Sequence, residues 1–443
     1  AFVTPSTAAA ATTAAPVHVH AEPRLVMVSL DGFRHDLITR KNATSGEYLA
    51  PTLRMLALRG VAVRQTASVF PSSTFPNHYT LATGNVPRHH GIVQNKFYDP
   101  QRDAVFTMPK TDGFWYEQAE SIWISAERQG QRAACFTWVG SESTINGTKC
   151  SYFLRFADGD SNVAKIQKLV DELDKPYAPR LFMLYFPDVD SAEHHHGVLS
   201  PQADAAVAKV DKELEYLLDL LHLPDRRRRF PNVNVMVMAD HGHANITDVV
   251  AFDALPLALD TELWLLSTGA VAQLRANDAA HCTPPCRAAH VVLDEAYDNL
   301  TRWLDAQPAP RPFAVYRTDV DDAARRPPPE FEYTGNARIA PLVVVMRHGV
   351  YSSRSGRTTQ KSSHGWDPSH ADMHSAFVAA GPAFVAPPAE RRLPPEHFFT
   401  HDAFNNTDVY ELACAVLGLT PATNDGDLRR VAASFLRAAP GAR

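Results

Sequence analysis

Short apolar runs recur along the chain, and segments with helical apolar spacing lie between several of them. One run begins at Arg24 and ends at the acid Asp31, and the others lie at 61–69, 132–138, 181–186, 233–239, 341–346 and 375–379. Helical spacing occurs at 47–59, from Thr74 onward and at 205–221. Such runs are typical of buried parallel strands. Their alternation with helices predicts an α/β fold with a mostly parallel sheet.

The remaining segments set the expected domain organisation. Residues 1–22 are rich in Ala and Thr and have no apolar period, so we expect a disordered stalk. Residues 23–435 are expected to form a single domain. The stretch from about 250 to 340 is Pro-rich and less regular. It predicts an irregular insertion or cap rather than a separate domain.

Charge and hydropathy exclude some classes of partner. The net charge is −6, from 43 basic and 49 acidic residues. There is no broad basic field, so no nucleic-acid partner is predicted. The arginine run at 226–229 is expected to be a solvated loop. No stretch approaches the roughly 20 apolar residues that span a bilayer, and a membrane anchor, if there is one, is expected outside this sequence.

Cysteines and sequons favour an oxidising compartment. Cys135 and Cys150 could pair across a strand and a loop. Cys282 and Cys286 could close a small disulfide in a Pro-rich loop, while Cys414 is expected to be a buried free thiol. We therefore expect a glycoprotein that is secreted or lies at the extracellular face of the cell. The Asn-x-Ser/Thr sequons begin at Asn42, Asn146, Asn245, Asn299 and Asn405.

Acidic residues follow three of the predicted strands. Asp31 ends the first run, Asp190 follows the run at 181–186, and Asp240 follows the run at 233–239. A single acid after a strand is commonly a helix cap or a turn residue. Two of these acids have a histidine close by, His194 and His241. Because ligand sites of open α/β sheets lie at the carboxyl ends of strands, we expect the three acids to converge. Zinc accepts Asp and His ligands.

Thr74 lies where a loop is predicted to enter a helix. One interpretation is an ordinary helix start with Thr74 as its cap. The other uses the helix N-terminus, where free N–H groups and the helix dipole favour anions. A hydroxyl there can coordinate a metal, lose its proton and attack phosphorus, since zinc lowers the pKa of bound oxygen ligands.

In these motifs the chain resembles the nucleotide pyrophosphatase/phosphodiesterases of the alkaline phosphatase superfamily. The resemblance covers about residues 24–430. It implies an alkaline phosphatase-like, doubly wound sheet flanked by helices, and a site for two zinc ions. The segments that carry it, in chain order, are SLDGFR, FPSSTFPNHYTLATG, HGIVQNKFYDP, ESIWISAERQG, DVDSAEHHHG, ADHG, NARIAPLVVV, SSHGWDP and GLTPATNDG.

The resemblance also implies two sets of metal ligands. One zinc ion would be held by Asp31, Thr74, Asp240 and His241. The other would be held by Asp190, His194 and His364. Asp188 competes with Asp190 for its place, and the spacing to His194 favours Asp190. His195 and His196 are expected either to contact a ligand residue without binding the metal or to be solvated. His243, where the family has an apolar residue, is assigned no role.

Substrate-binding residues follow from the same resemblance. Asn95 would donate to a phosphate oxygen, and Phe75 would pack on a nucleobase. Phe156 is the candidate for the opposite aromatic wall. Ser73 departs from the pattern, because many nucleotide-cleaving members have Lys beside the threonine.

The expected activity is zinc-dependent hydrolysis of phosphodiester or pyrophosphate bonds in extracellular nucleotides or nucleotide sugars. Thr74 would form a threonyl intermediate. Three alternatives stay open: a lipid or choline-phosphate phosphodiesterase, a phosphomonoesterase, and an inactive ectodomain that acts as a binding module. An ethanolamine-phosphate transferase is disfavoured because membrane spans are missing.

Overall fold

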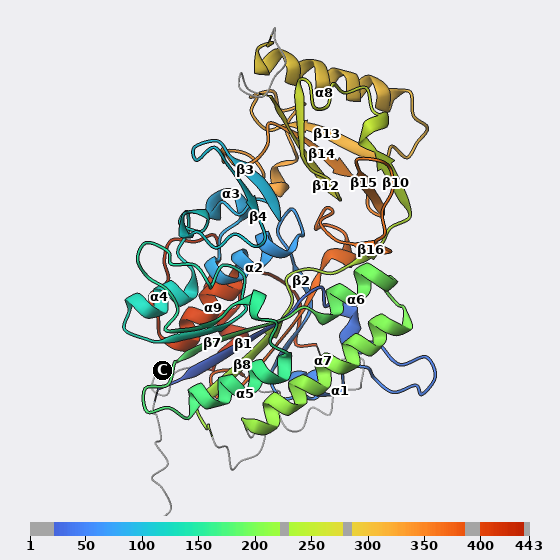
Figure 1. Ribbon diagram of the computed structural model, residues 1–443. Coiled ribbons are helices and arrows are strands. Elements are labelled where there is room, and N and C mark those ends of the chain that lie inside the picture. The colour runs from blue at the N-terminus through green and yellow to red at the C-terminus, as the bar shows by residue number, and fades with distance from the viewer. Residues whose placement is uncertain (1–21, 222–229, 278–285, 386–398, 438–443) are drawn as a thin grey trace, which may run out of the picture.

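The structure, a computed structural model, describes residues 22–221, 230–277, 286–385 and 399–437 (Figure 1). The expected stalk at 1–22 therefore lies outside the described residues except for Glu22. The arginine run at 226–229 and Cys282 also lie outside them.

The core is a mostly parallel sheet of eight described strands in the order β18-β2-β17-β8-β1-β7-β5-β6. The β17 strand is antiparallel to both of its neighbours, and the other pairings are parallel. The predicted α/β fold is thus confirmed. The strands are β1 (Arg24–Leu30), β2 (Val61–Ala67), β5 (Ala133–Phe136), β6 (Tyr152–Leu154), β7 (Leu181–Phe186), β8 (Val233–Met238), β17 (Ser375–Ala380) and β18 (His401–Asn405).

Helices cover both faces of this sheet, which makes it doubly wound (Figure 1). Successive strand residues point to opposite faces. In β1, Leu25 and Met27 join the core under α2 (Thr74–Thr83), α4 (Ile122–Arg128) and α9 (Asp408–Leu417). The alternate residues Val26 and Val28 join the core over α1 (Pro51–Ala57), α5 (Asn162–Leu173) and α7 (Pro201–Leu220). The strand is buried on both sides, which explains its unbroken apolar run.

The interval at about 250–340 is more regular than its sequence suggested. Its strands form a four-stranded antiparallel sheet in the order β11-β12-β14-β13, set apart from the main sheet and covered by α8 (Ala289–Asp305) (Figure 1). The apolar run at 341–346 belongs to this smaller sheet rather than to the main one. The strands are β11 (Leu263–Ser267), β12 (Val271–Ala276), β13 (Phe313–Arg317) and β14 (Leu342–Met346).

Short elements complete the described chain. Three strand pairs are β3 (Lys96–Asp99) with β4 (Ala104–Thr107), β9 (Ala244–Asn245) with β16 (Ser362–Ser363), and β10 (Asp248–Ala251) with β15 (Val350–Ser353). The remaining α-helices are α3 (Pro87–His90), α6 (Asp188–His196) and α10 (Ala432–Phe435). The 3-10 turns are η1 (His35–Thr39), η2 (Gly113–Trp115), η3 (Phe156–Asp158), η4 (Phe252–Ala254), η5 (Pro329–Phe331), η6 (Ala371–Met373) and η7 (Leu428–Arg430). Among the described helices, none has both the length and the apolar character needed to cross a bilayer.

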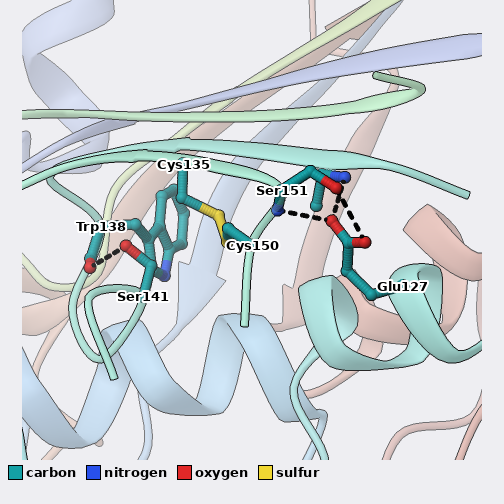
Figure 2. Close-up of a disulfide and its surroundings, with 7 residues drawn as sticks. Glu127, Cys135, Trp138, Ser141, Cys150 and Ser151 are labelled. Atoms are coloured by element: carbon teal, nitrogen blue, oxygen red, sulfur yellow. Dashed lines mark hydrogen bonds between the residues drawn. A yellow bond between two sulfur atoms is a disulfide. The ribbon is translucent and has the colours of Figure 1, made fainter. Parts of the chain in front are cut away.

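A disulfide joins Cys135 of β5 to Cys150, just before β6 (Figure 2). Beside it, Glu127 of α4 accepts hydrogen bonds from the backbone N–H and the hydroxyl of Ser151 at 2.7 and 2.9 Å. The bridge and these bonds tie the β5–β6 connection to the sheet edge. Cys414 is a buried free thiol, as expected. The expected Cys282–Cys286 bridge cannot be traced, because Cys282 lies outside the described residues.

The double substitution Cys135→Ala/Cys150→Ala is expected to lower the free energy of unfolding by about 2–3 kcal/mol, because the bridge closes a loop with a sequence separation of 15 residues. Urea unfolding without reductant measures the loss. Cys414→Ala is the matched control, since it deletes a buried thiol and leaves this bridge intact. A double variant as stable as the Cys414→Ala protein would contradict the prediction.

Candidate active site

The site lies at the carboxyl ends of three adjacent strands, β8, β1 and β7. Asp31 directly follows β1, and Asp240 follows β8. Asp190 lies in the first turn of α6, which follows β7. Parallel neighbours end at the same edge of a sheet, so the order of the strands brings the three acids together.

A first cluster consists of Asp31, Asp240 and His241. The Nε2 atom of His241 lies 3.0 Å from Asp240 Oδ2 and 3.6 Å from Asp31 Oδ1. Thr74 is the first residue of α2, and its Oγ1 lies 3.2 Å from the same Nε2 atom. The Nδ1 atom of His241 lies 3.0 Å from the carbonyl oxygen of Gly242, which leaves Nε2 for a ligand.

Two buried carboxylate oxygens of the first cluster, Asp31 Oδ1 and Asp240 Oδ2, make no hydrogen bond in the described chain. Asp240 Oδ2 faces the ring nitrogens of His241 at 3.0 Å and His78 at 3.2 Å, whereas Asp31 Oδ1 has His241 Nε2 at 3.6 Å. The other oxygens are held, since Tyr185 donates its hydroxyl to Asp31 Oδ2 and Gly32 donates its N–H to Asp240 Oδ1 at 3.2 Å. Burial, together with the charges of Asp240 and Asp190, raises the pKa of Asp31 well above its ordinary value. Buried carboxylate oxygens that make no hydrogen bond fit a cation.

A second cluster consists of Asp190, His194, His243 and His364. Three imidazole Nε2 atoms approach Asp190 Oδ1: His243 at 3.2 Å, His194 at 3.3 Å and His364 at 3.6 Å. Burial alone raises the pKa of Asp190, but hydrogen bonds with His194 and His243 bring it well below its ordinary value.

Backbone carbonyls orient two histidines of the second cluster. His194 Nδ1 lies 2.9 Å from the Ser362 carbonyl oxygen, and His364 Nδ1 lies 3.1 Å from that of Ser72. This arrangement leaves Nε2 free, as in metal-binding histidines. Burial and the nearby His241 lower the pKa of His364 well below its ordinary value, so its ring is neutral at neutral pH. By residue type, the donors of both clusters fit zinc, which binds imidazole and carboxylate.

Asn77 braces the loop that presents Thr74. Its Nδ2 donates to the carbonyl oxygens of Pro71 and Ser73, both at 2.9 Å. Its Oδ1 accepts from the N–H of Val69 at 2.9 Å. The loop before α2 is thus fixed by a side chain of α2 itself, and Thr74, with 9% of its surface exposed, is held at the helix start.

Asn95, the residue before β3, contacts the start of α2. Its Oδ1 accepts a hydrogen bond from the backbone N–H of Phe75 at 2.9 Å. This bond orients the amide so that Nδ2 is the atom available to donate. Asn95 and Thr74 line the same cavity, so the predicted phosphate donor and the predicted nucleophile face one space.

That cavity has a volume of about 950 Å³ and contains members of both clusters. Phe75 and Phe156 line it, and Phe75 meets Phe106 edge-on with ring centroids 5.7 Å apart. Phe156 is 57% exposed. Tyr351 of β15 is a further aromatic wall that the sequence did not predict, and the side chains of Lys96 and Lys110 add positive charge.

The structure places the competing residues elsewhere. Asp188 binds Lys209 at 2.6 Å and Asn162 at 2.7 Å and belongs to neither cluster. His195 and His196 are exposed, the solvated position expected for them. His243, to which no role was assigned, is instead fully buried in the second cluster. Its position two residues after the predicted ligand His241 was the sequence signal that could have identified it as a site residue.

Comparison with known proteins indicates one family. A family model described as type I phosphodiesterase/nucleotide pyrophosphatase matches residues 25–367. The Xenopus laevis protein named bis(5'-adenosyl)-triphosphatase enpp4 is 29% identical over 408 residues, which cover 92% of this chain and 80% of that protein. Human ectonucleotide pyrophosphatase/phosphodiesterase family member 5 is 28% identical over 419 residues, which cover 93% of this chain and 77% of that protein.

Solved structures show the same likeness. A threonine-to-alanine variant of murine ectonucleotide pyrophosphatase/phosphodiesterase 5, described as inactive and in complex with AMP, has a TM-score of 0.79 at 28% identity. The match covers 94% of this chain and 100% of that one. The alkaline phosphatase-like fold expected from the sequence is thereby confirmed.

Asp31→Asn is expected to stabilise the metal-free protein at neutral pH. Because the folded state raises the pKa of Asp31, the native protein holds a proton there that the unfolded chain has lost, and stability falls as pH rises above about 4. Each unit of elevation costs about 1.4 kcal/mol at a pH above both pKa values. Urea unfolding in the presence of a chelator should give the variant a higher free energy of unfolding than the wild type at about pH 8. The two free energies should become equal near about pH 4.

Asp171→Asn, at an exposed position of α5, is the matched control and should change little. Added zinc should stabilise the wild type more than Asp31→Asn, because the amide carries no negative charge. An Asp31→Asn protein less stable than the wild type throughout this pH range, in chelator, would contradict the prediction.

Proposed function

This chain belongs to the type I phosphodiesterase/nucleotide pyrophosphatase family of hydrolases, and from that premise we propose that it cleaves phosphodiester or pyrophosphate bonds of extracellular nucleotides or nucleotide sugars. The observation that carries the proposal is the position of Thr74. Thr74 is the first residue of α2. Its hydroxyl lies 3.2 Å from His241 Nε2, and the residue lines a cavity that contains members of both clusters.

Two zinc ions are the proposed cofactors. When bound, they would lower the pKa of the Thr74 hydroxyl and offset negative charge on the phosphate. The buried oxygens of Asp31 and Asp240 that make no hydrogen bond in the described chain support this assignment, as do the convergent imidazoles. The first ion would be held by Asp31, Thr74, Asp240 and His241, and the second by Asp190, His194 and His364.

The residues of the chain then perform a two-step transfer. Thr74 gives its hydroxyl proton to solvent, and its Oγ1 forms a bond to phosphorus while the bond from phosphorus to the leaving oxygen breaks. The leaving oxygen takes up a proton from solvent, and the nucleotidyl group stays on Thr74. In the second step water attacks the phosphorus of this nucleotidyl-threonine, the bond from phosphorus to Oγ1 breaks, and Oγ1 takes back a proton, which releases the nucleoside monophosphate and regenerates Thr74. Asn95 Nδ2 donates to a non-bridging oxygen, and the N-terminus of α2 favours the phosphate charge.

Nucleotides are the proposed substrates. Phe75, Phe156 and Tyr351 offer apolar walls for a base, and Lys96 and Lys110 suit the charge of a longer phosphate chain. AMP bound to the murine relative and the triphosphatase name of the frog relative support this choice over a lipid or choline ester. The threonine-to-alanine variant described as inactive supports a threonine nucleophile.

An extracellular location is part of the proposal. Relatives are named ectonucleotide pyrophosphatases, and the Cys135–Cys150 bridge suits an oxidising compartment.

Thr74→Ala is expected to lower kcat at least about 10³-fold, whereas Thr74→Ser keeps a hydroxyl and retains part of the activity. Acid quenching of the wild type with a ³²P-labelled nucleotide diester should trap label on Thr74, located by peptide mass spectrometry. Label on another residue, or substantial turnover by Thr74→Ala at equal zinc content, would refute the threonyl intermediate.

Phe75→Ala and Phe156→Ala are expected to raise KM for a nucleoside-monophosphate nitrophenyl ester about 10-fold, because each loses stacking worth about 1–3 kcal/mol per base. A small nitrophenyl diester without a base is the control substrate and should be nearly unaffected. The wild type should also prefer the nucleotide diester to nitrophenyl phosphate in kcat/KM. Equal losses on both diesters would remove the nucleotide assignment and favour the lipid or choline-ester alternative.

A further inference from the structure

We propose that His243 is a fourth protein ligand of the second zinc ion, beside Asp190, His194 and His364. The inference rests on the proposed two-zinc site and extends it, because His243 occupies a position where the resembling family has an apolar residue. With three protein ligands a zinc ion takes a phosphate oxygen as its fourth ligand, and with four it would take that oxygen as a fifth, as catalytic zinc sites can.

The chain topology places His243 opposite His364. The β9 and β16 strands pair antiparallel, with Ser363 facing Ala244 and Ser362 facing Asn245. Continued by one residue, this register sets His364 against His243. Directly opposed residues of an antiparallel pair share one face, and the two rings lie 5.3 Å apart between centroids. The strand pairing that presents His364 to the second cluster therefore presents His243 to it as well.

The distances from Asp190 suit a shared zinc ion, and all four ligand atoms lie within 4.8 Å of one another. Zinc–nitrogen and zinc–oxygen bonds of about 2.0–2.2 Å place tetrahedral ligand atoms roughly 3.3–3.5 Å apart. His243 Nε2 lies 3.2 Å from Asp190 Oδ1, against 3.3 Å for His194 and 3.6 Å for His364. His243 is thus placed as well as the two histidines that the family resemblance selects.

The backbone around His243 has little freedom to move the ring away. Arg34, itself buried, donates from Nη1 to the His243 carbonyl oxygen at 3.1 Å. The preceding Gly242 is packed so closely that a Cβ there would lie 2.1 Å from the Asp372 carbonyl oxygen. The His243 side chain is fully buried, so Nε2 is held facing the cluster.

The competing role for His243 is a hydrogen-bond donor that orients Asp190. Its Nδ1 has no hydrogen-bond partner in the described chain, so no carbonyl fixes the tautomer as it does for His194 and His364. One carboxylate oxygen, however, has only about two lone pairs to offer, and three Nε2 atoms converge on Asp190 Oδ1. A shared cation accounts for all three contacts.

Two substitutions separate the roles. His243→Gln keeps an N–H donor for Asp190 but removes the imidazole, and His243→Leu removes both. If His243 is a ligand, chelator competition should show at least about 10-fold weaker binding of one of the two zinc ions in both variants. If it only donates to Asp190, His243→Gln should bind zinc like the wild type, and the inference falls. His364→Ala is the positive control, and His370→Ala, at an exposed histidine of the same segment, is the negative control.

A second measurement needs no variant. In crystals of the zinc-loaded wild type, anomalous scattering should place a zinc ion about 2.0–2.2 Å from His243 Nε2. A separation of about 3 Å or more is too long for a zinc–nitrogen bond and would overturn the inference. A wild type that binds no zinc would refute the proposed function and this inference with it. Two bound zinc ions, one lost in His364→Ala but neither weakened in the His243 variants, would refute this inference alone.

Discussion

The site depends on two carboxylates, Asp31 and Asp240, buried where adjacent strands end. A buried charge is costly unless it is paired. Burial alone raises the pKa of Asp240, but the imidazoles of His241 and His78, which face its Oδ2 atom, bring that pKa well below its ordinary value. Asp31 has Tyr185 at Oδ2 but no hydrogen bond at Oδ1 in the described chain, and burial raises its pKa. The electrostatic cost therefore falls on Asp31, where a bound cation would relieve it.

The scaffold tolerates this cost because the central strands of the sheet are buried on both faces. Three strands, β7, β1 and β8, are buried along their whole length between two helical layers. Burial of apolar area at about 25 cal/mol per Å² offsets a few unfavourable polar groups at one edge. The acids occupy strand ends, where the chain must leave the sheet and where a change of direction does not interrupt the core.

Much of this arrangement could be predicted from the sequence. Strands buried on both faces appear as continuous apolar runs, so β1, β7 and β8 and the acids after them were identifiable. The smaller sheet was not, because β12 and β13 are only partly buried and lie between Pro-rich segments. Tyr351 could not be predicted, since β15 pairs with β10, about 100 residues earlier in the sequence. His243 could have been, because it lies two residues after the predicted ligand His241.

The main sheet and the region around the smaller sheet supply different residues of the site. Asp31, Asp190 and Asp240 follow strands of the main sheet, while His364 follows β16 and Tyr351 lies on β15. The turn between β11 and β12 also lines the cavity, and Gly269 in that turn exchanges two backbone hydrogen bonds of 3.0 Å with Ser352, next to Tyr351. Changes in this region can reshape the walls of the cavity without disturbing the acids at the sheet edge. Selectivity for the group attached to the phosphate is therefore expected to vary with the smaller sheet, while the bond-breaking chemistry stays with the larger one.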